Sequence, residues 1–336
     1  MNVPKYWKGS SADIEKAMAT IKKGEKKVLC RSAGGENIYA VQYGDVKKFN
    51  RKANFSSAAG AGDVSCYADK SGDYKKNILL VGTIHGAEFE GTVALLNLIQ
   101  ILETGRDFAM NEHSELTELA ESVNICIIPS INPDGRKKVP FNSMVSKSYE
   151  DMRYYNQGTW ADGSLAGWPE CKKLHPMKGN VGYLGGYYND DGINLMHDNF
   201  FKPMAEETKA LFDLVDLLVP DITVLLHGGA NCVNTLLKPA YAPMPIKKEL
   251  AQFEAMHQKT CKKEGLDFKI EPFDFDNEGI KSFNLSSALT HLCGEPCVVY
   301  ETNQGLNYGN YMLSYEEIYK HHLLLFKTLL EFYKNV

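Results

Sequence analysis

Residues 77–103 read NILLVGTIHGAEFEGTVALLNLIQILE, and the spacing of their apolar residues changes at His85. Residues 77–84 form an apolar run rich in branched side chains, which is typical of a strand buried on both faces. Beyond His85, apolar residues recur at helical spacing through residue 103. A buried strand followed by a buried helix is the repeating unit of an α/β fold. We therefore expect an α/β sheet that is covered by helices.

The same alternation continues on both sides of this stretch. The apolar patterns predict further buried strands at 123–130, 221–229 and 296–302. They predict helices at 11–23, 206–219, 247–265, 286–294 and 314–336. Two short strands around a Gly-Gly turn, at about 27–33 and 37–43, predict a hairpin. Residues 44–76 are polar and small, and they are expected to form a loop or irregular strand.

The domain organisation follows from the absence of a repeat or linker in this pattern. We expect a single domain over residues 1–336, which is long enough to bury a large core. Its N-terminal segment, about 10–45, combines a helix with the hairpin. A long aromatic-rich excursion, about 136–192, shows little periodicity. Because loops of this length in compact domains are usually functional, the excursion is a candidate wall of a substrate site.

The composition argues against several classes of protein. The chain has 336 residues, is 24% charged and carries a formal net charge of −5, which gives no reason to expect a nucleic-acid partner. Its eight cysteines are scattered, and several lie in apolar runs, so we expect free thiols rather than disulfides. The N-terminus lacks an apolar signal core, and no run approaches the ~20 apolar residues of a membrane span. We therefore expect a cytoplasmic protein without a membrane partner.

Polar residues capable of chemistry follow four of the predicted strands. His85 and Glu88 come after the strand at 77–84, His227 lies near the end of the strand at 221–229, and Glu301 ends the last strand. The strand at 123–130 is followed by a further polar group, Asn132, Asp134 and Arg136. In open α/β sheets, ligands bind outside the carboxyl ends of the strands. The sequence therefore predicts one site at this edge.

The residue types in this group indicate a hydrolytic zinc site. Such sites take three protein ligands from His, Asp and Glu and keep a fourth position for water. His85 and Glu88 offer two ligands on one turn with small residues between them, and His227 supplies the third from another strand. Glu301, in an apolar setting, is the candidate general base. Singly, His85 could be a structural histidine and Glu88 an acidic residue favoured by a helix N-terminus; their joint placement favours one zinc ion per chain.

These motifs resemble the M14 zinc carboxypeptidase family. The resemblance rests on HGAE at 85–88, INPDGR at 131–136, VLLHGG at 224–229 and VVYE at 298–301. The hairpin segment CRSAGGENIYAVQYG at 30–44 is also similar. The resemblance covers nearly the whole chain. It implies a three-layer α/β/α sandwich around a mixed sheet of about eight strands, and a metallopeptidase that acts on a peptide or amide substrate.

The resemblance also shows where the chain departs from the family. The segment that holds an Asn-Arg pair for the terminal carboxylate reads GINLMHDNF at 192–200 and contains no arginine. Asn194 is a candidate substrate-binding residue. A cationic His197 could replace the arginine, or Asp198 could pair with a substrate amine. Arg153 is the candidate for the arginine that polarises the scissile carbonyl, although it could equally be a stacked structural side chain. Arg136 either binds a substrate carboxylate or is solvated.

The sequence therefore predicts a zinc peptidase of carboxypeptidase type with altered recognition of the terminal carboxylate. Peptides with non-standard linkages, such as cell-wall stem peptides, are possible substrates. Two alternatives remain open: an N-acyl amino acid deacylase of the aspartoacylase type, and a non-catalytic peptide-binding module. The helix predicted at 314–336 disfavours the first, because that group carries an added β-domain. The complete ligand set with Glu301 disfavours the second. The sequence does not indicate the oligomeric state.

Overall fold

The computed structural model describes residues 2–272 and 280–335. Its strands are β1 (Glu25–Arg31), β2 (Asn37–Tyr43), β3 (Asn77–Val81), β4 (Asn124–Ile128), β5 (Gly158–Trp160), β6 (Val181–Leu184), β7 (Ile222–Gly229), β8 (Thr235–Leu237) and β9 (Cys297–Asn303). Among the described residues, seven of them form the main sheet, in the order β1-β2-β4-β3-β7-β9-β8. Strands β4, β3, β7 and β9 are parallel neighbours. Strands β2 and β8 pair antiparallel with β4 and β9, and β1 completes a hairpin with β2.

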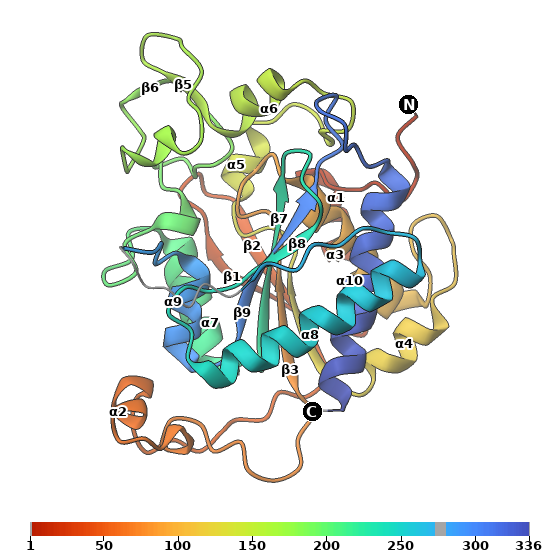
Figure 1. Ribbon diagram of the computed structural model, residues 1–336, viewed down its shortest axis with the longest axis vertical. Helices are drawn as coiled ribbons and strands as arrows, with labels where there is room; N and C mark the ends of the chain where they lie inside the picture. Colours follow the sequence, from red (N-terminus) through yellow and green to blue (C-terminus); the bar gives the residue numbers. More distant parts are fainter. Residues whose placement is uncertain (1, 273–279, 336) are drawn as a thin grey trace.

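Helices cover both faces of this sheet (Figure 1). The longer ones are α1 (Ser11–Thr20), α3 (Phe89–Thr104), α7 (Glu206–Leu218), α8 (Met244–Lys263), α9 (Leu285–Cys293) and α10 (Tyr315–Lys334). The shorter ones are α2 (Phe55–Gly60), α4 (Ser114–Ala120), α5 (Pro133–Lys137), α6 (Tyr149–Asn156) and three single 3₁₀ turns, η1 (Val64–Cys66), η2 (Glu170–Lys172) and η3 (Leu195–His197). This arrangement confirms the predicted mixed α/β fold, with seven strands in the main sheet where the resemblance implied about eight.

Alternation along β3 shows why the sheet needs a layer on each face. Ile78 and Leu80 pack into the core shared with α3, α8 and α10, whereas Leu79 and Val81 pack into the core shared with α7 and α9. All five residues of β3 are buried. Successive side chains of a strand point to opposite faces, so an apolar run without polar interruptions is stable only when both faces are covered.

Two local predictions differ from the structure in detail. The helix expected to begin at His85 begins at Phe89, and His85 to Glu88 belong to the loop between β3 and α3. Residues 44–76 are mainly loop, as expected, but they also include α2 and η1. The N-terminal hairpin is confirmed by the antiparallel pairing of β1 and β2.

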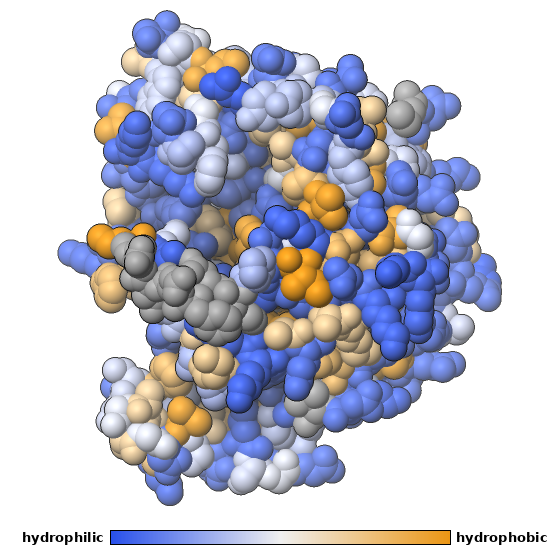
Figure 2. Space-filling model, in the orientation of Figure 1, coloured by the Kyte–Doolittle hydropathy of each residue, from blue (hydrophilic) through white to orange (hydrophobic). Residues whose placement is uncertain are grey.

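The excursion that begins after β4 lies above the carboxyl ends of the central strands (Figure 1). It contains α5, α6 and the small antiparallel sheet β5-β6, and it has its own core of Ala166, Cys171, Met177 and Tyr188. The face shown in Figure 2 is hydrophilic over most of its area. All eight cysteines are free. Of the helices in the described ranges, none has the length and apolar character that crossing a bilayer requires.

Candidate metal centre and substrate cavity

Three neighbouring strands bring the predicted metal and catalytic residues to one edge of the sheet. Strand β3 lies beside β7, and β7 lies beside β9, all in parallel. His227 on β7 is the register partner of Glu301 on β9. The loop after β3 carries His85 and Glu88 over the same edge. The parallel register therefore places side chains from distant parts of the chain in one site.

Close backbone packing holds the loop between β3 and α3 in place. A Cβ atom on Gly86 would lie 1.9 Å from the carbonyl carbon of Gly135, so only glycine fits there. The Gly86 amide donates a hydrogen bond of 2.6 Å to the carbonyl of Gly186 in the excursion. The Asn132 side chain donates to the carbonyl of Ile84 at 3.0 Å and accepts from the Gly135 amide at 2.8 Å. The Asn-Pro-Asp-Gly turn thus holds the loop by close packing and a hydrogen bond.

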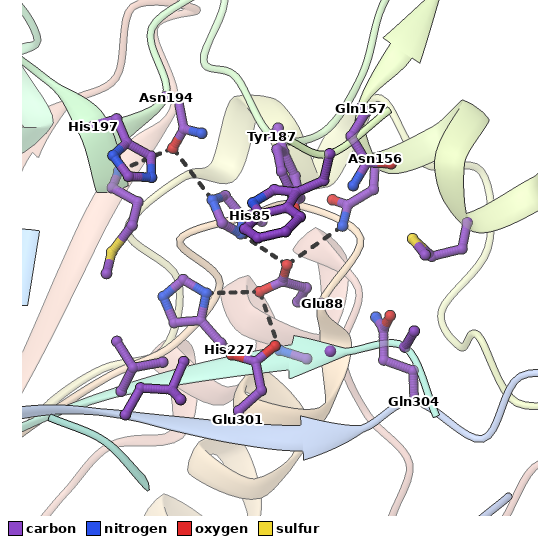
Figure 3. A pocket seen from close by; sticks show the side chains of 18 of the residues that line it. His85, Glu88, Asn156, Gln157, Tyr187, Asn194, His197, His227, Glu301 and Gln304 are labelled. Atoms are coloured by element: carbon purple, nitrogen blue, oxygen red, sulfur yellow. Dashed lines mark hydrogen bonds and ion pairs between the residues drawn. The ribbon is translucent and has the colours of Figure 1, made fainter. Parts of the chain in front are cut away.

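The side chains of His85, Glu88 and His227 point toward one another (Figure 3). Glu88 Oε1 lies 2.8 Å from His85 Nδ1, and Glu88 Oε2 lies 2.9 Å from His227 Nδ1. One ligand atom from each residue lies within 4.8 Å of the other two. The three residues are only 7%, 2% and 4% exposed, respectively. This group is the one cluster of potential metal ligands in residues 2–272 and 280–335.

A second hydrogen bond sets the orientation of His85. Its Nε2 lies 3.2 Å from Oδ1 of Asn194, which also accepts from the amide of Met196. An amide oxygen only accepts, so His85 Nε2 is the donor in this contact, and with a metal ion bound Nδ1, beside Glu88, would be the ring nitrogen left for the metal. Metal-binding histidines are typically held in this way, with the second ring nitrogen donating to an oxygen acceptor.

The charges of the site depend on one another. Burial favours the neutral form of Glu88, but the two imidazoles outweigh burial and hold the pKa of Glu88 well below its usual range. Burial, with a smaller contribution from the negative charge of Glu88, raises the pKa of Glu301 to about 7. A carboxyl group with a pKa near neutrality can both accept and return a proton.

The donor set fits a zinc ion. Two imidazoles and one carboxylate are a known ligand set of hydrolytic zinc sites, which keep an open fourth position. His227 Nε2 is buried and has no hydrogen-bond partner in the described part of the chain, as expected of a side chain that needs a further partner. The carboxylate of Glu88 between two imidazoles supplies the negative charge that a divalent cation requires.

The site opens into a cavity of about 400 Å³. Its floor is formed by the carboxyl ends of β7 and β9, and the excursion contributes much of its wall. The lining residues that bear on the chemistry are His85, Glu88, Asn156, Gln157, Lys172, Tyr187, Asn194, His197, His227, Glu301 and Gln304. A cavity of this size accommodates a substrate of a few residues beside the metal centre.

Comparisons with known proteins agree with this geometry. The family model for zinc carboxypeptidase matches residues 16–167. Over these residues the chain is similar to the M14 zinc carboxypeptidases. This match and the metallo-carboxypeptidase fold indicate a zinc metallopeptidase. The matched residues include His85 and Glu88 but neither His227 nor Glu301, which the fold brings to the same site.

Solved structures of carboxypeptidases share this fold. A metallo-carboxypeptidase from Burkholderia cenocepacia superposes with a TM-score of 0.60 at 14% identity, covering 96% of this chain and 67% of that one. The carboxypeptidase A from Helicoverpa armigera superposes with a TM-score of 0.56 at 11% identity, covering 100% of this chain and 77% of that one. At such identities the likeness concerns the fold. A comparison with curated protein sequences finds no match.

Arg136 does not line the cavity and is buried, so the prediction that it binds substrate or is solvated is wrong. Its guanidinium is buried and lies 4.4 Å from the ring centroid of Phe89. It donates hydrogen bonds to the carbonyls of Gly9, Val139 and Phe141 and to the side chain of Asn142. Burial lowers the pKa of Arg136 to about 10. These hydrogen bonds occupy the donors of the guanidinium and hold the N-terminal segment against the turn.

Arg153 also lies outside the cavity lining, contrary to its predicted role at the scissile carbonyl. Its Nη2 donates to the carbonyl of Leu165 at 3.2 Å, within the excursion. Asn156 and Gln157, one turn further along, face the cavity instead. Arg153 therefore has a structural contact within the excursion, but no stacked ring is found for it in the part of the chain that the structure describes.

Of the three residues predicted in the 192–200 segment, two line the cavity. Asn194 does so, but its side chain contacts His85. His197 lines the cavity too, yet burial, helped by the positive charge of Lys172, lowers its pKa to about 3, so it is neutral near pH 7 rather than cationic. Asp198 does not line the cavity; it accepts from the amides of Met204 and Ala205 before α7. The prediction that Asp198 pairs with a substrate amine is wrong.

Several cavity residues were missed by the sequence patterns. The Tyr187 ring stacks on His85 with centroids 3.8 Å apart. Asn156 donates to Glu88 Oε1 at 3.4 Å, and its own Oδ1 is buried with no partner among the described residues. Lys172 lines the cavity from η2. The clustering of Tyr187 with other aromatic residues was a usable signal, but nothing in the spacing of Asn156 or Lys172 distinguishes them from surface residues.

Proposed function

We propose that this protein hydrolyses a peptide or amide bond with one zinc ion held by His85, Glu88 and His227 and with Glu301 as general base. The observation that carries the proposal is the convergence of three buried ligand atoms beside a fourth, protonatable carboxyl group. A structural site has no use for Glu301, because its charge is costly to bury without a role or a partner.

Each residue has a distinct task in this reaction. A zinc ion in this position would polarise the scissile carbonyl and lower the pKa of a water molecule to about 7. Glu301 takes the proton from the attacking water and returns it to the leaving nitrogen. Asn194 fixes the tautomer of His85, so that Nδ1 is free to bind the metal. The stacked Tyr187 ring shields one face of His85 from water.

We assign stabilisation of the oxyanion to Asn156 in place of Arg153. Asn156 is 1% exposed, lines the cavity and carries an amide that points toward Glu88. Side-chain amides stabilise oxyanions in other hydrolases. No arginine lines this cavity in the described ranges. Recognition of the substrate's terminal carboxylate therefore differs from an Asn-Arg clamp, which supports a carboxypeptidase-type enzyme of altered specificity.

Zinc analysis together with digestion of a peptide library tests the proposal. The wild-type protein should contain about one zinc per chain and cleave a subset of peptides. Glu301→Gln should keep the zinc and lose about 10²–10⁴-fold in rate, because only the proton acceptor is removed. His227→Ala should lose most of the zinc, because it removes a ligand. Glu264→Gln, on the exposed end of α8, is a matched control and should behave as wild type.

The outcomes separate the proposal from its rivals. Cleavage of N-acyl amino acids but of no peptide would favour the deacylase. A protein that binds peptides without zinc and without turnover would favour the binding module. Full activity of Glu301→Gln would contradict the assignment of the general base.

A further inference from the structure

One strongly basic side chain lines the cavity. It is far from the metal ligands in the sequence. Among the lining residues in the described ranges, Lys172 is the only lysine or arginine. It belongs to η2 in the excursion, and its Nζ lies 4.8 Å from the ring centroid of Trp168, which also lines the cavity. An ammonium on an aromatic face is attracted to the ring but remains able to bind an anion.

Lys172 has no carboxylate partner within residues 2–272 and 280–335. Two other lysines that contact the excursion do have one: Lys138 pairs with Asp190 at 2.7 Å, and Lys178 pairs with Asp191 at 3.1 Å. Partial burial lowers the pKa of Lys172, and the residue is still exposed to solvent. An anion that reaches its ammonium would favour the charged form.

Lys172 lines the same cavity as His197, which belongs to the 192–200 segment where the family resemblance leads one to expect an Asn-Arg pair. His197 itself is neutral near pH 7, so it cannot replace the arginine. Met196, Leu237 and Val299 add apolar surface to the lining. A substrate that enters the cavity therefore meets one lysine, Lys172, besides the metal-centre residues and neutral side chains.

We propose that the Lys172 ammonium binds a carboxylate of the substrate and so selects acidic peptides for this site. The inference rests on the proposed function, because it places the carboxylate beside the same metal centre. Lysine offers a point charge with three rotatable donors, whereas arginine offers a rigid fork. The carboxylate can therefore come from a free C-terminus or from an acidic side chain near the scissile bond.

Four matched peptides distinguish these sources. They carry either a free or an amidated C-terminus, combined with either Glu or Gln next to the scissile bond. Lys172→Met should lose roughly ten- to a hundred-fold in kcat/KM, mainly through KM, on peptides that carry the recognised carboxylate, since a hydrogen bond to a charged group is lost. The uncharged peptide should be cleaved at the wild-type rate, and zinc content should not change. If removal of one of the two carboxylates lowers kcat/KM as much as Lys172→Met does, that carboxylate is the one that Lys172 recognises.

Lys173→Met is the control, because Lys173 neighbours Lys172 but does not line the cavity. A loss that is equal on acidic and uncharged peptides, or no loss on any of them, would overturn the proposal. Calorimetry of the same peptides with zinc-loaded Glu301→Gln, with and without Lys172→Met, gives a readout independent of turnover. Binding of acidic peptides that depends on Lys172, without cleavage by the wild type, would refute the proposed function and support this inference. Binding that does not depend on Lys172 would overturn it.

Discussion

The polar residues at the carboxyl ends of β3, β7 and β9 and those that follow β4 have different roles. His85, His227 and Glu301 converge in the cavity, at the edge where their parallel strands end. Asn132 and Arg136 come from the same kind of position, yet their side chains bind backbone carbonyls instead. The sheet thus places a polar residue at a strand end near the site. Its contacts then decide whether it takes part in the reaction or holds the surrounding backbone in place.

The two groups, the residues that converge in the cavity and those that bind backbone carbonyls, differ in how many of their hydrogen-bond donors and acceptors have a partner. Arg136 has hydrogen bonds to four different acceptors, so it has little capacity left for a substrate. His227 Nε2 and the Oδ1 of Asn156 are buried and have no partner among the described residues. Because buried polar atoms are normally paired, unpaired ones around a cavity indicate where a ligand belongs.

Asn156→Ala gives the strongest test of this comparison. If its amide stabilises the oxyanion, kcat should fall by about 10²–10³-fold while the zinc content stays the same. If its role is only to orient Glu88, through the 3.4 Å contact, zinc affinity should fall instead. Metal titration and steady-state kinetics on one preparation separate the two results. Asn199→Ala, which changes an asparagine that does not line the cavity, is the control.

The main features of the fold and of the metal cluster were accessible from the sequence because regular structure determines them. The apolar run in β3 and the switch to helical spacing after it predict a buried strand and helix. The parallel register then places His227 beside Glu301 without any further information. These positions follow from backbone geometry, which short sequence patterns encode well.

The substrate side of the cavity was predicted less well, because the excursion is not regular. Asp198 follows the expected motif position, but hydrogen bonds to the amides before α7 turn it away from the cavity. Lys172 and Asn156 reach the cavity through turns and short helices whose direction depends on tertiary contacts. Periodicity carries no information about such contacts.

Arg136→Met tests the supporting group. Four acceptors would lose a buried charged partner, so the free energy of unfolding should fall by about 3 kcal/mol. The zinc content and kcat of the folded fraction should change little. Chemical denaturation measures the free energy of unfolding, and kinetics at low temperature measures kcat. Arg106→Met removes an arginine from an exposed ion pair with Glu112 and should cost about 0.5 kcal/mol or less. A stable Arg136→Met protein with a raised KM would break the comparison.

Arg153→Gln should have the smallest effect. Among the described residues the guanidinium makes one hydrogen bond, to the carbonyl of Leu165, and it does not line the cavity. We therefore expect kcat/KM to stay within about two- to three-fold of the wild-type value. Asn156→Ala, three residues further along the same helix, is the matched contrast with its much larger expected loss. A hundred-fold loss in Arg153→Gln with zinc retained would mean that α6 turns on substrate binding and carries the guanidinium to the scissile carbonyl. The hydrogen bonds that a residue makes in the protein without substrate would then no longer tell whether it supports the fold or takes part in the reaction.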